Sequence, residues 1–429
     1  MSSEENKKSV VTRFPPSPTG FLHIGRARTA LFNYLYARKN NGKLIFRLED
    51  TDKARSKPEF EQNFYDCLNW LGIKWDNEKV IRQSERTEVY KNYVHKMVKE
   101  EKAYISKEEN GNEVVRFRNP NKKVTFTDLI RGDITFDTTE LEDFIIARNI
   151  NEPLYHLTAV VDDFEGGITH VIRGDDGISN TPRQILIQEA IGAPKPVYAH
   201  LPLILAADRS KLSGRHGAVS VTEYKDAGYL PEALTNYLAL LGWNPGTEQE
   251  IFSMDELIQA FDLTKVNKAG AVFNPEKLKW FNKQYISKMS LDEFKKAAAP
   301  FATDVPEKLW PLLKERTIIL SELKDLSEFD FLSKKPDYPK EKLNWKETPA
   351  NKARLEETKK LVESVSDFTK ENVKSALWPL AEKEGKGEVL WPLRIALSGK
   401  DKSPDPFILC ELLGKEESLS RINHAISLL

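Results

Sequence analysis

The chain has 429 residues, 40% hydrophobic and 30% charged, which is enough for several domains and a large buried core. Its 64 Lys and Arg residues balance 65 Asp and Glu residues to a net charge of −1, which excludes a polybasic coat for nucleic acid but not a local basic surface. No apolar run approaches the roughly 18 residues of a membrane helix, and Met1–Lys8 resembles neither a signal peptide nor a transit peptide. Cys67 and Cys410 lie far apart, so we expect no disulfide framework and no metal site. A cytoplasmic protein is the simplest expectation.

The first 210 residues alternate between strand-like and helix-like segments. Residues 10–14 predict a buried strand, residues 27–39 a helix with apolar positions at helical spacing, and residues 43–48 a second strand parallel to the first. A second such unit has a strand over residues 168–173, a turn over 174–177 and a helix opening near Thr181, where Thr181 and Gln184 predict a capping box. The pattern indicates an α/β fold with a doubly wound parallel sheet.

Two regions depart from this alternation. Between the two units, short alternating stretches at residues 114–118, 124–126 and 133–136 indicate a small α+β insertion. After residue 220 the pattern becomes helical, with a helix predicted over Pro231–Leu241. From about residue 290 nearly everything predicts helix, apart from loops at residues 334–339, 385–387 and 399–406. We therefore expect an α/β body followed by a helical C-terminal region.

The segment Arg13–Arg26 carries the most chemical information. It joins the first predicted strand to the first helix, and doubly wound folds bind ligands at the carboxyl ends of their strands. The N-terminus of the helix offers free N–H groups to a phosphate, and Gly20 and Gly25 let the backbone approach a nucleotide. His23 is placed to donate a hydrogen bond to a phosphate oxygen. Read alone, the same residues also fit an ordinary proline-rich loop with a capping histidine.

The full string is more specific. Pro16-Ser-Pro-Thr-Gly20 followed by His23-Ile-Gly25 resembles the first signature of class I aminoacyl-tRNA synthetases of the glutamyl/glutaminyl branch. Other segments resemble the same family in the expected order: Phe46–Asp52, Tyr155–His156, Val161–Asp163, Ile168–Asp176, Ser179–Pro182, Lys211–Gly217 and Gly228–Leu234. Trp391–Gly399 and Phe407–Lys415 resemble the helical anticodon-binding domain of its bacterial-type glutamyl members.

This resemblance implies a division of the chain. Residues 1–100 and 155–205 would form the two halves of a Rossmann-like catalytic domain, and residues 101–154 an α+β insertion that binds the tRNA acceptor end. Residues 206–289 would hold the second signature loop and the helices that contact the tRNA stem. Residues 290–429 would form the all-helical anticodon-binding domain.

The resemblance also implies a reaction and its residues. Glutamate would attack ATP, with Mg²⁺ as cofactor, to form glutamyl-adenylate, and the 3′ end of tRNA(Glu) would then accept the glutamyl group; the family is usually monomeric. His23, Lys211 and Arg215 would be catalytic, with Gly20, His23, Gly25 and Lys211 binding ATP. Arg13, Ser17, Glu49, Tyr155 and Arg173 would bind glutamate, since two carboxylates and one ammonium suit two arginines and one carboxylate. Arg316 would contact the anticodon, although a helix-surface ion pair fits it as well. No resident metal site is implied.

One departure from the family pattern concerns chemistry. The second signature loop reads Lys211-Leu-Ser-Gly-Arg215, with Gly214 where the family usually has a second lysine. We expect Lys211 and Arg215 to share that role. Two alternatives remain open: an enzyme that also charges tRNA(Gln) with glutamate, and a synthetase-like RNA-binding paralogue with impaired catalysis.

Overall fold

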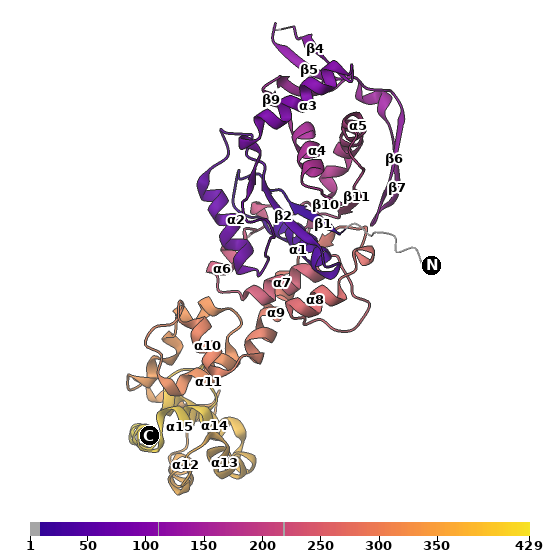
Figure 1. Cartoon of the computed structure of the whole chain (residues 1–429). Coiled ribbons are helices and arrows are strands. Elements are labelled where there is room, and N and C mark those ends of the chain that lie inside the picture. Colours follow the sequence, from indigo (N-terminus) through magenta and orange to yellow (C-terminus); the bar gives the residue numbers. More distant parts are fainter. Residues whose placement is uncertain (1–8, 110, 218) are drawn as a thin grey trace. The chain divides into compact units, whose positions relative to one another are not determined.

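The computed structural model describes residues 9–109, 111–217 and 219–429 (Figure 1). The expectation about targeting segments in Met1–Lys8 concerns residues outside these ranges. The chain divides into two compact units, Met1–Lys288 and Met289–Leu429. The finer division of the chain into five parts remains a prediction.

The N-terminal strand–helix–strand unit confirms the first prediction. Strands β1 (Val11–Phe14), β2 (Lys43–Leu48) and β3 (Ile81–Arg82) form a parallel sheet in that order, with Val11 opposite Lys43 and Phe14 opposite Phe46. Helix α1 (Ile24–Lys39) connects β1 to β2 and is buried over most of its length. It starts three residues before the predicted position, because His23 caps its N-terminus.

The second unit lies beside the first. Strands β10 (His170–Gly174) and β11 (Val197–Leu201) are parallel, and helices α4 (Tyr155–Glu165) and α5 (Thr181–Ile191) pack with them. Thr169, just before β10, joins the two sheets: its backbone N–H donates to the carbonyl oxygen of Val11, and its Oγ1 accepts from the Val11 N–H at 2.8 Å. The carboxyl ends of β1, β2, β10 and β11 consequently meet at one edge, as the doubly wound prediction requires.

The insertion contributes strands to two sheets. Its hairpin, β6 (Lys123–Asp128) and β7 (Gly132–Asp137), extends the second sheet in the order β10-β11-β6-β7, so it belongs to that sheet as well as to the insertion. A separate antiparallel sheet contains β4 (Ala103–Lys107), β5 (Glu113–Phe117), β8 (Ile145–Asn149) and β9 (Glu152–Pro153). The predicted strands are confirmed; the pairing of β6 with β11 was not foreseen.

One local prediction was wrong. Asn180, rather than Thr181, occupies the N-cap of α5, and no side chain caps that helix. A short 3₁₀ helix (Asp175–Asn180) leads directly into α5, and the N–H of Thr181 donates to the carbonyl of Ile178. Thr181 and Gln184 instead accept hydrogen bonds from Arg173. The two residues with the spacing of a capping box therefore bind the side chain of Arg173 instead of capping α5.

The remaining elements of the first unit surround these sheets. They are α2 (Pro58–Trp70), α3 (Thr87–Lys99), α6 (Val221–Asp226), α7 (Pro231–Leu240), α8 (Met254–Ala260), α9 (Pro275–Lys288) and the paired strands β12 (Ile204–Leu205) and β13 (Ala271–Val272). The helix predicted over Pro231–Leu241 is confirmed as α7.

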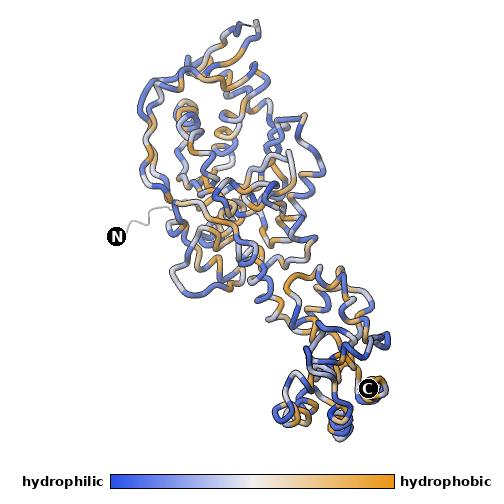
Figure 2. Tube along the Cα trace, turned by 180° about the vertical axis from the view of Figure 1, so that it is seen from behind, coloured by the Kyte–Doolittle hydropathy of each residue, from blue (hydrophilic) through white to orange (hydrophobic). Residues whose placement is uncertain are grey.

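The C-terminal unit is helical, as predicted, but less continuously. Its helices are α10 (Leu291–Ala298), α11 (Trp310–Arg316), α12 (Lys352–Ser364), α13 (Lys370–Glu384), α14 (Lys386–Ser398), α15 (Pro406–Leu413) and α16 (Lys415–Leu428). The loop predicted at residues 334–339 is confirmed, and the rest of residues 317–351 contains short 3₁₀ helices and turns instead of α-helix. The loop predicted at residues 385–387 is wrong in its extent: Gly385, at a φ of +101°, alone separates α13 from α14, and residues 386–387 already belong to α14. Figure 2 shows hydrophobic and hydrophilic residues interspersed along this part of the trace.

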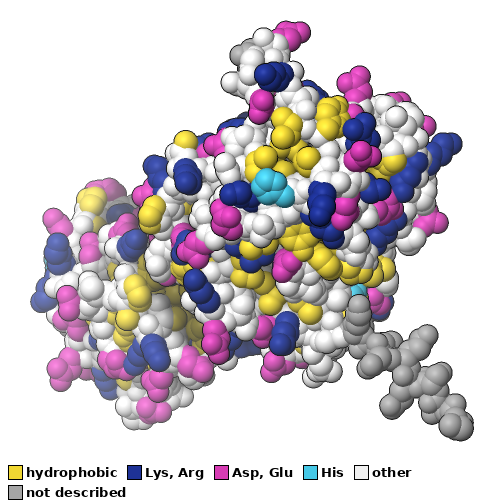
Figure 3. All heavy atoms as spheres, turned by 45° about the horizontal axis from the view of Figure 1, so that its top comes forward, with side chains coloured by type: hydrophobic (Ala, Val, Ile, Leu, Met, Phe, Trp, Pro, Cys, Tyr) yellow, Lys and Arg dark blue, Asp and Glu magenta, His cyan; other side chains and the backbone are white. Residues whose placement is uncertain are grey.

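Positive and negative side chains are mixed on the surface, in line with the balanced net charge. On the face shown in Figure 3, Lys and Arg side chains are interspersed with Asp and Glu, and hydrophobic side chains gather near its middle. Among the described residues, no helix is both long and apolar enough to cross a membrane.

Candidate active site

A cavity of about 730 Å³ opens where β1, β2, β10 and β11 end and α1 begins. Its lining includes nine of the residues predicted from the sequence: Arg13, Ser17, Gly20, His23, Gly25, Glu49, Tyr155, Arg173 and Lys211. Residues more than 190 positions apart in the sequence thus share one site. Arg215 lies outside this lining, and Arg316 belongs to the C-terminal unit.

His23 presents one ring nitrogen toward this cavity as a donor. Its Nδ1 accepts the backbone N–H of Gly25 at 3.0 Å, so in the neutral ring the proton resides on Nε2. Burial, together with the nearby cations Arg26 and Lys211, lowers the pKa of His23. The N–H of Ile24 donates to the carbonyl of Val219 and that of Gly25 to His23, so these first N–H groups of α1 are not free, contrary to the expectation from the sequence. A neutral Nε2–H on His23 suits a phosphate oxygen.

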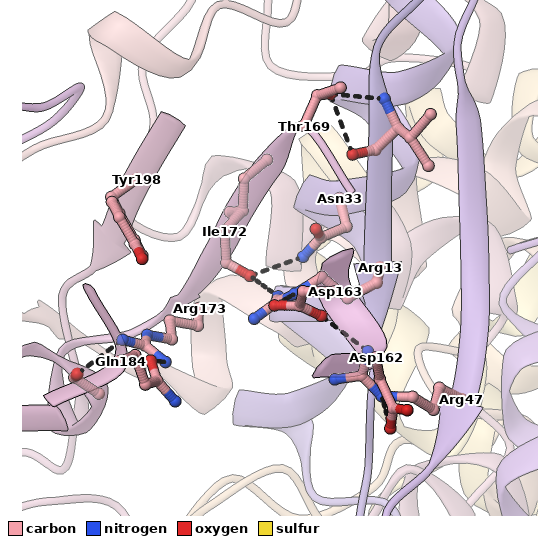
Figure 4. Close-up of polar contacts among 12 residues, drawn as sticks. Arg13, Asn33, Arg47, Asp162, Asp163, Thr169, Ile172, Arg173, Gln184 and Tyr198 are labelled. Atoms are coloured by element: carbon pink, nitrogen blue, oxygen red, sulfur yellow. Dashed lines mark hydrogen bonds and ion pairs between the residues drawn. The ribbon is translucent and has the colours of Figure 1, made fainter. Parts of the chain in front are cut away.

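Arg13 projects from β1 and is fixed by two contacts. Its Nε donates to Asp163 at 3.4 Å and its Nη1 donates to the carbonyl oxygen of Ile172 at 3.1 Å (Figure 4). The side chain is only 5% exposed. These contacts use Nε and one Nη1 hydrogen, which leaves Nη2 for a ligand in the cavity. Arg13 can therefore bind a carboxylate without giving up its support.

A buried charge network underlies this arrangement. Arg47 on β2, which is 2% exposed, donates to Asp163 at 2.7 Å and to Glu49 at 3.1 Å, and lies 3.6 Å from Asp162. Burial opposes the charge of Arg47, but the three carboxylates raise its pKa above the ordinary value. Burial also works against the charge of Asp163, yet Arg47 and Arg13 hold its pKa below the ordinary value. Asp163 thereby stays ionised between two arginines.

Glu49 lies between this network and the cavity. Its Oε1 accepts from Arg47, and its backbone N–H donates to the carbonyl of Pro16, which ties the residue to the first signature loop. Burial and the nearby charge of Asp163 raise the pKa of Glu49, and together they outweigh Arg47 and Arg13, which lower it. A cationic ligand group beside Glu49 would stabilise its charged form. The residue therefore suits an ammonium.

Arg173, at the end of β10, is held more tightly than Arg13. It donates from Nε to His200, from Nη1 to Gln184 and from Nη2 to Gly177 and Thr181, at distances between 2.8 and 3.1 Å. Four of its five N–H groups thus have partners within the described chain. Arg173 can offer one Nη1 hydrogen to a ligand while these contacts persist, in contrast to the two-pronged fork suggested by its residue type.

Tyr155 and the loop around Lys211 complete the cavity. Tyr155 begins α4 and remains 43% exposed. Lys211 is exposed beside the strand β12, where it pairs with Leu205. Arg215 turns back onto its own loop, with Nε on His216 and Nη2 on Ser210. A Cβ added at Gly214 would meet no heavy atom within 4 Å, so the loop has room for a side chain there.

In the C-terminal unit, Arg316 forms an ion pair with Glu328 at 3.2 Å and its guanidinium lies over the ring of Phe329. Both contacts are those of an ordinary helix-surface arginine.

Sequence reasoning missed the supporting residues. Asp163 and Arg47 belong to segments that resembled the family, but neither was assigned a role. A signal existed for Arg47, because an arginine between the apolar residues Phe46 and Leu48 of a predicted buried strand requires a buried partner.

Comparison with known proteins places this geometry in a family. A model of the catalytic domain of tRNA synthetases class I (E and Q) matches residues 9–110 and 106–280, and a model of an anticodon binding domain matches residues 273–426. The chain belongs to the class I tRNA synthetases of the E and Q branch. As a member of this class, it is a ligase that uses ATP.

Relatives of this synthetase span nearly its whole length. It is 39% identical to a glutamate–tRNA ligase from Thermodesulfovibrio yellowstonii, over 97% of the chain and 99% of the relative. It is 40% identical to glutamate–tRNA ligase 1 from Syntrophus aciditrophicus, over 98% of each. A crystal structure of a glutamate tRNA ligase from Elizabethkingia meningosepticum, in complex with its amino acid, superimposes with a TM-score of 0.87 at 34% identity and covers 98% of this chain. The expected fold class, an α/β catalytic domain followed by helical domains, is confirmed.

Proposed function

We propose that this synthetase activates L-glutamate with ATP and transfers the glutamyl group to the 3′ end of tRNA(Glu). The observation that carries the proposal is the joint presence of Arg13, Arg173 and Glu49 in one cavity with His23. Two cations and one carboxylate complement the two carboxylates and one ammonium of glutamate. The names of the relatives support the same substrate.

The glutamate pocket works by charge and position. Arg13 and Arg173 each direct an N–H group at a carboxylate, Glu49 accepts the ammonium, and Ser17 and Tyr155 supply hydroxyl groups. Glutamine has an amide in place of one carboxylate, so it would leave one guanidinium without its charge partner. We propose this loss as the basis of discrimination between the two amino acids.

ATP would occupy the part of the cavity next to α1. The substrates supply both nucleophiles, first the glutamate carboxylate and then a tRNA hydroxyl, so the protein positions groups and neutralises charge. His23 donates from Nε2 to a phosphate oxygen, Gly20 and Gly25 admit the phosphates, and Lys211 and Arg215 counter the charge of the pyrophosphate. Among the described residues no group of three or more His, Cys, Asp or Glu could cage a metal ion. Mg²⁺, when bound together with ATP, would supply further charge neutralisation at the phosphates.

The proposal includes the partner and the setting. Arg316 would reach the anticodon by exchanging its pairing with Glu328 for contacts to RNA. We propose a monomer in the cytoplasm, where the two free, buried cysteines suit a reducing medium.

An aminoacylation assay tests the proposal. Purified protein is combined with ATP, Mg²⁺, labelled glutamate or glutamine, and tRNA(Glu) or tRNA(Gln). Esterified glutamate on tRNA(Glu) alone supports the proposal. Glutamate on both tRNAs indicates an enzyme without discrimination between them, and no ester with any pairing indicates an RNA-binding paralogue. Binding of tRNA without ester formation would overturn the proposed activity and leave the fold assignment intact.

A further inference from the structure

Arg173 rests on a fully buried histidine. His200 on β11 has no exposed surface, and its Nε2 accepts the Nε–H of Arg173 at 3.1 Å. An arginine only donates hydrogen bonds, so Nε2 of His200 must be unprotonated for this contact to exist. The hydroxyl of Thr181 lies 3.3 Å from Nε2 and 3.2 Å from the carbonyl oxygen of Gly177, to which it can donate. His200 therefore offers an acceptor to Arg173.

The second ring nitrogen of His200, Nδ1, fixes this tautomer. Nδ1 of His200 lies 2.7 Å from Oδ2 of Asp128, which is 1% exposed. With Nε2 unprotonated, the ring proton resides on Nδ1 and is donated to this carboxylate. Burial lowers the pKa of His200 although Asp128 opposes it, so the ring is neutral near pH 7. The carboxylate selects the tautomer that Arg173 needs.

Asp128 is itself held rigidly. Its Oδ1 accepts the backbone N–H groups of Ile130 and Arg131, both at 2.9 Å, and its Oδ2 accepts the backbone N–H of His200 at 3.0 Å as well as the ring. Burial favours the neutral acid, but the hydrogen bonds from His200 and from the backbone hold the pKa of Asp128 below its ordinary value. Asp128 ends β6, so the insertion supplies it from outside the two strand–helix–strand units.

We propose that Asp128 and His200 are positioning residues that orient Arg173 for the substrate carboxylate. Asp128 fixes the proton on Nδ1 of His200, and the free Nε2 fixes the plane of the guanidinium. That plane determines where the single available Nη1 hydrogen points. This inference rests on the proposed function, since it takes glutamate to be the ligand of Arg173.

The first test compares two amide replacements in the full-length enzyme. In His200→Asn the amide nitrogen keeps a donor near Asp128 but removes the acceptor for Arg173, whereas in His200→Gln the amide oxygen reaches toward Arg173. We expect His200→Asn to raise KM for glutamate about 10-fold to 100-fold, the range for losing a hydrogen bond to a charged group. KM for ATP should change less than about 2-fold, and His200→Gln should recover most of the glutamate affinity.

The second test moves the proton. In Asp128→Asn an amide NH₂ facing the ring drives the proton to Nε2, which then opposes the Nε–H of Arg173 as donor against donor, much as the wrong tautomer arises in an altered catalytic triad. We expect the same selective rise in KM for glutamate. His170→Asn, on β10 three residues before Arg173, is the matched control and should leave both KM values unchanged.

The outcomes separate this inference from the proposed function. A wild-type enzyme that fails to charge tRNA with glutamate overturns the function. A wild-type enzyme that charges normally, with variants that alter glutamate and ATP parameters equally or lower kcat alone, overturns only the positioning role. Should His200→Asn not fold, the contrast between Asp128→Asn and His200→Gln decides the matter.

Discussion

Asp163 on α4 accepts a hydrogen bond of 2.7 Å from Nη1 of Arg47 on β2. The other oxygen of the same carboxylate lies 3.4 Å from Nε of Arg13 on β1. One helix residue thus holds arginines from two neighbouring strands, and only one of them, Arg13, reaches the cavity. The residues that support the proposed glutamate pocket are therefore distinct from the residues that would contact glutamate.

Replacing Asp163 by Asn should weaken glutamate binding. The change removes the charge that keeps Arg13 in place, so we expect KM for glutamate to rise roughly 10-fold, as for a lost charged hydrogen bond. Steady-state aminoacylation at saturating ATP and tRNA measures it. Glu165→Gln alters an exposed carboxylate on the same helix and should leave KM unchanged; an equal effect of both changes would contradict the prediction.

Replacing Arg47 by Met should destabilise the fold. The change leaves the carboxylates of Asp162, Asp163 and Glu49 close together without their shared cation, which costs about 3 kcal/mol or more in comparable buried pairs. Urea unfolding measures the loss. Arg55→Met removes a surface ion pair whose arginine side chain is 75% exposed, and it should change stability by less than about 0.5 kcal/mol. A neutral effect of Arg47→Met would count against the network.

Replacing Arg215 by Ala tests the signature loop. If Lys211 and Arg215 share the charge that a second lysine would supply, Arg215→Ala should lower pyrophosphate exchange about 10-fold or more. Gly214→Lys should raise it, because the position has room for a side chain. Gly214→Ala adds bulk without charge and serves as the control. Unchanged exchange in Arg215→Ala would rule out the shared role.

His156 should make stability depend on pH. Burial, with Arg183 and Arg173 nearby, lowers its pKa to about 4, and its Nδ1 is buried without a hydrogen-bond partner among the described residues. Between its ordinary pKa of 6.5 and about 4, the unfolded chain binds a proton that the folded chain does not. Stability should therefore fall as pH falls through this window. In His156→Gln the free energy of unfolding should depend less steeply on pH, because the uptake of up to one proton on unfolding is lost.

The measurement is urea unfolding at a series of pH values between about 4 and 7. His95→Gln, which alters an exposed histidine, is the control and should keep the wild-type slope. Parallel profiles for wild type and His156→Gln would show that His156 is not the source of the effect.

The elements that follow simple patterns could be predicted from the sequence. Residues 10–14 and 43–48 are short, largely buried runs separated by one helix, and this arrangement favours a parallel pair. The 3₁₀ turns on either side of the predicted loop at 334–339 could not be predicted, because apolar spacing alone does not separate an α-helix from a series of 3₁₀ turns. In the site, the residues at the cavity were identifiable because they lie in motifs that resemble those of the family.

The residues that hold Arg173 in place could not be predicted from such patterns. Thr181 and Gln184 have the spacing of a capping box, and only the position of Arg173 shows that they hold an arginine. The link from Asp128 to His200 spans 72 residues and depends on how β6 pairs with β11, which is a tertiary relationship. Local sequence reasoning reaches the groups that would touch a ligand more readily than the groups that hold them.

The pairing of β6 with β11 limits how this enzyme could be re-engineered. A chimera that exchanges the region between the two halves of the catalytic sheet for that of a relative would have to preserve an acidic residue at the end of β6. On the proposed positioning role, a graft that lost that residue would fold into a similar shape and bind glutamate poorly.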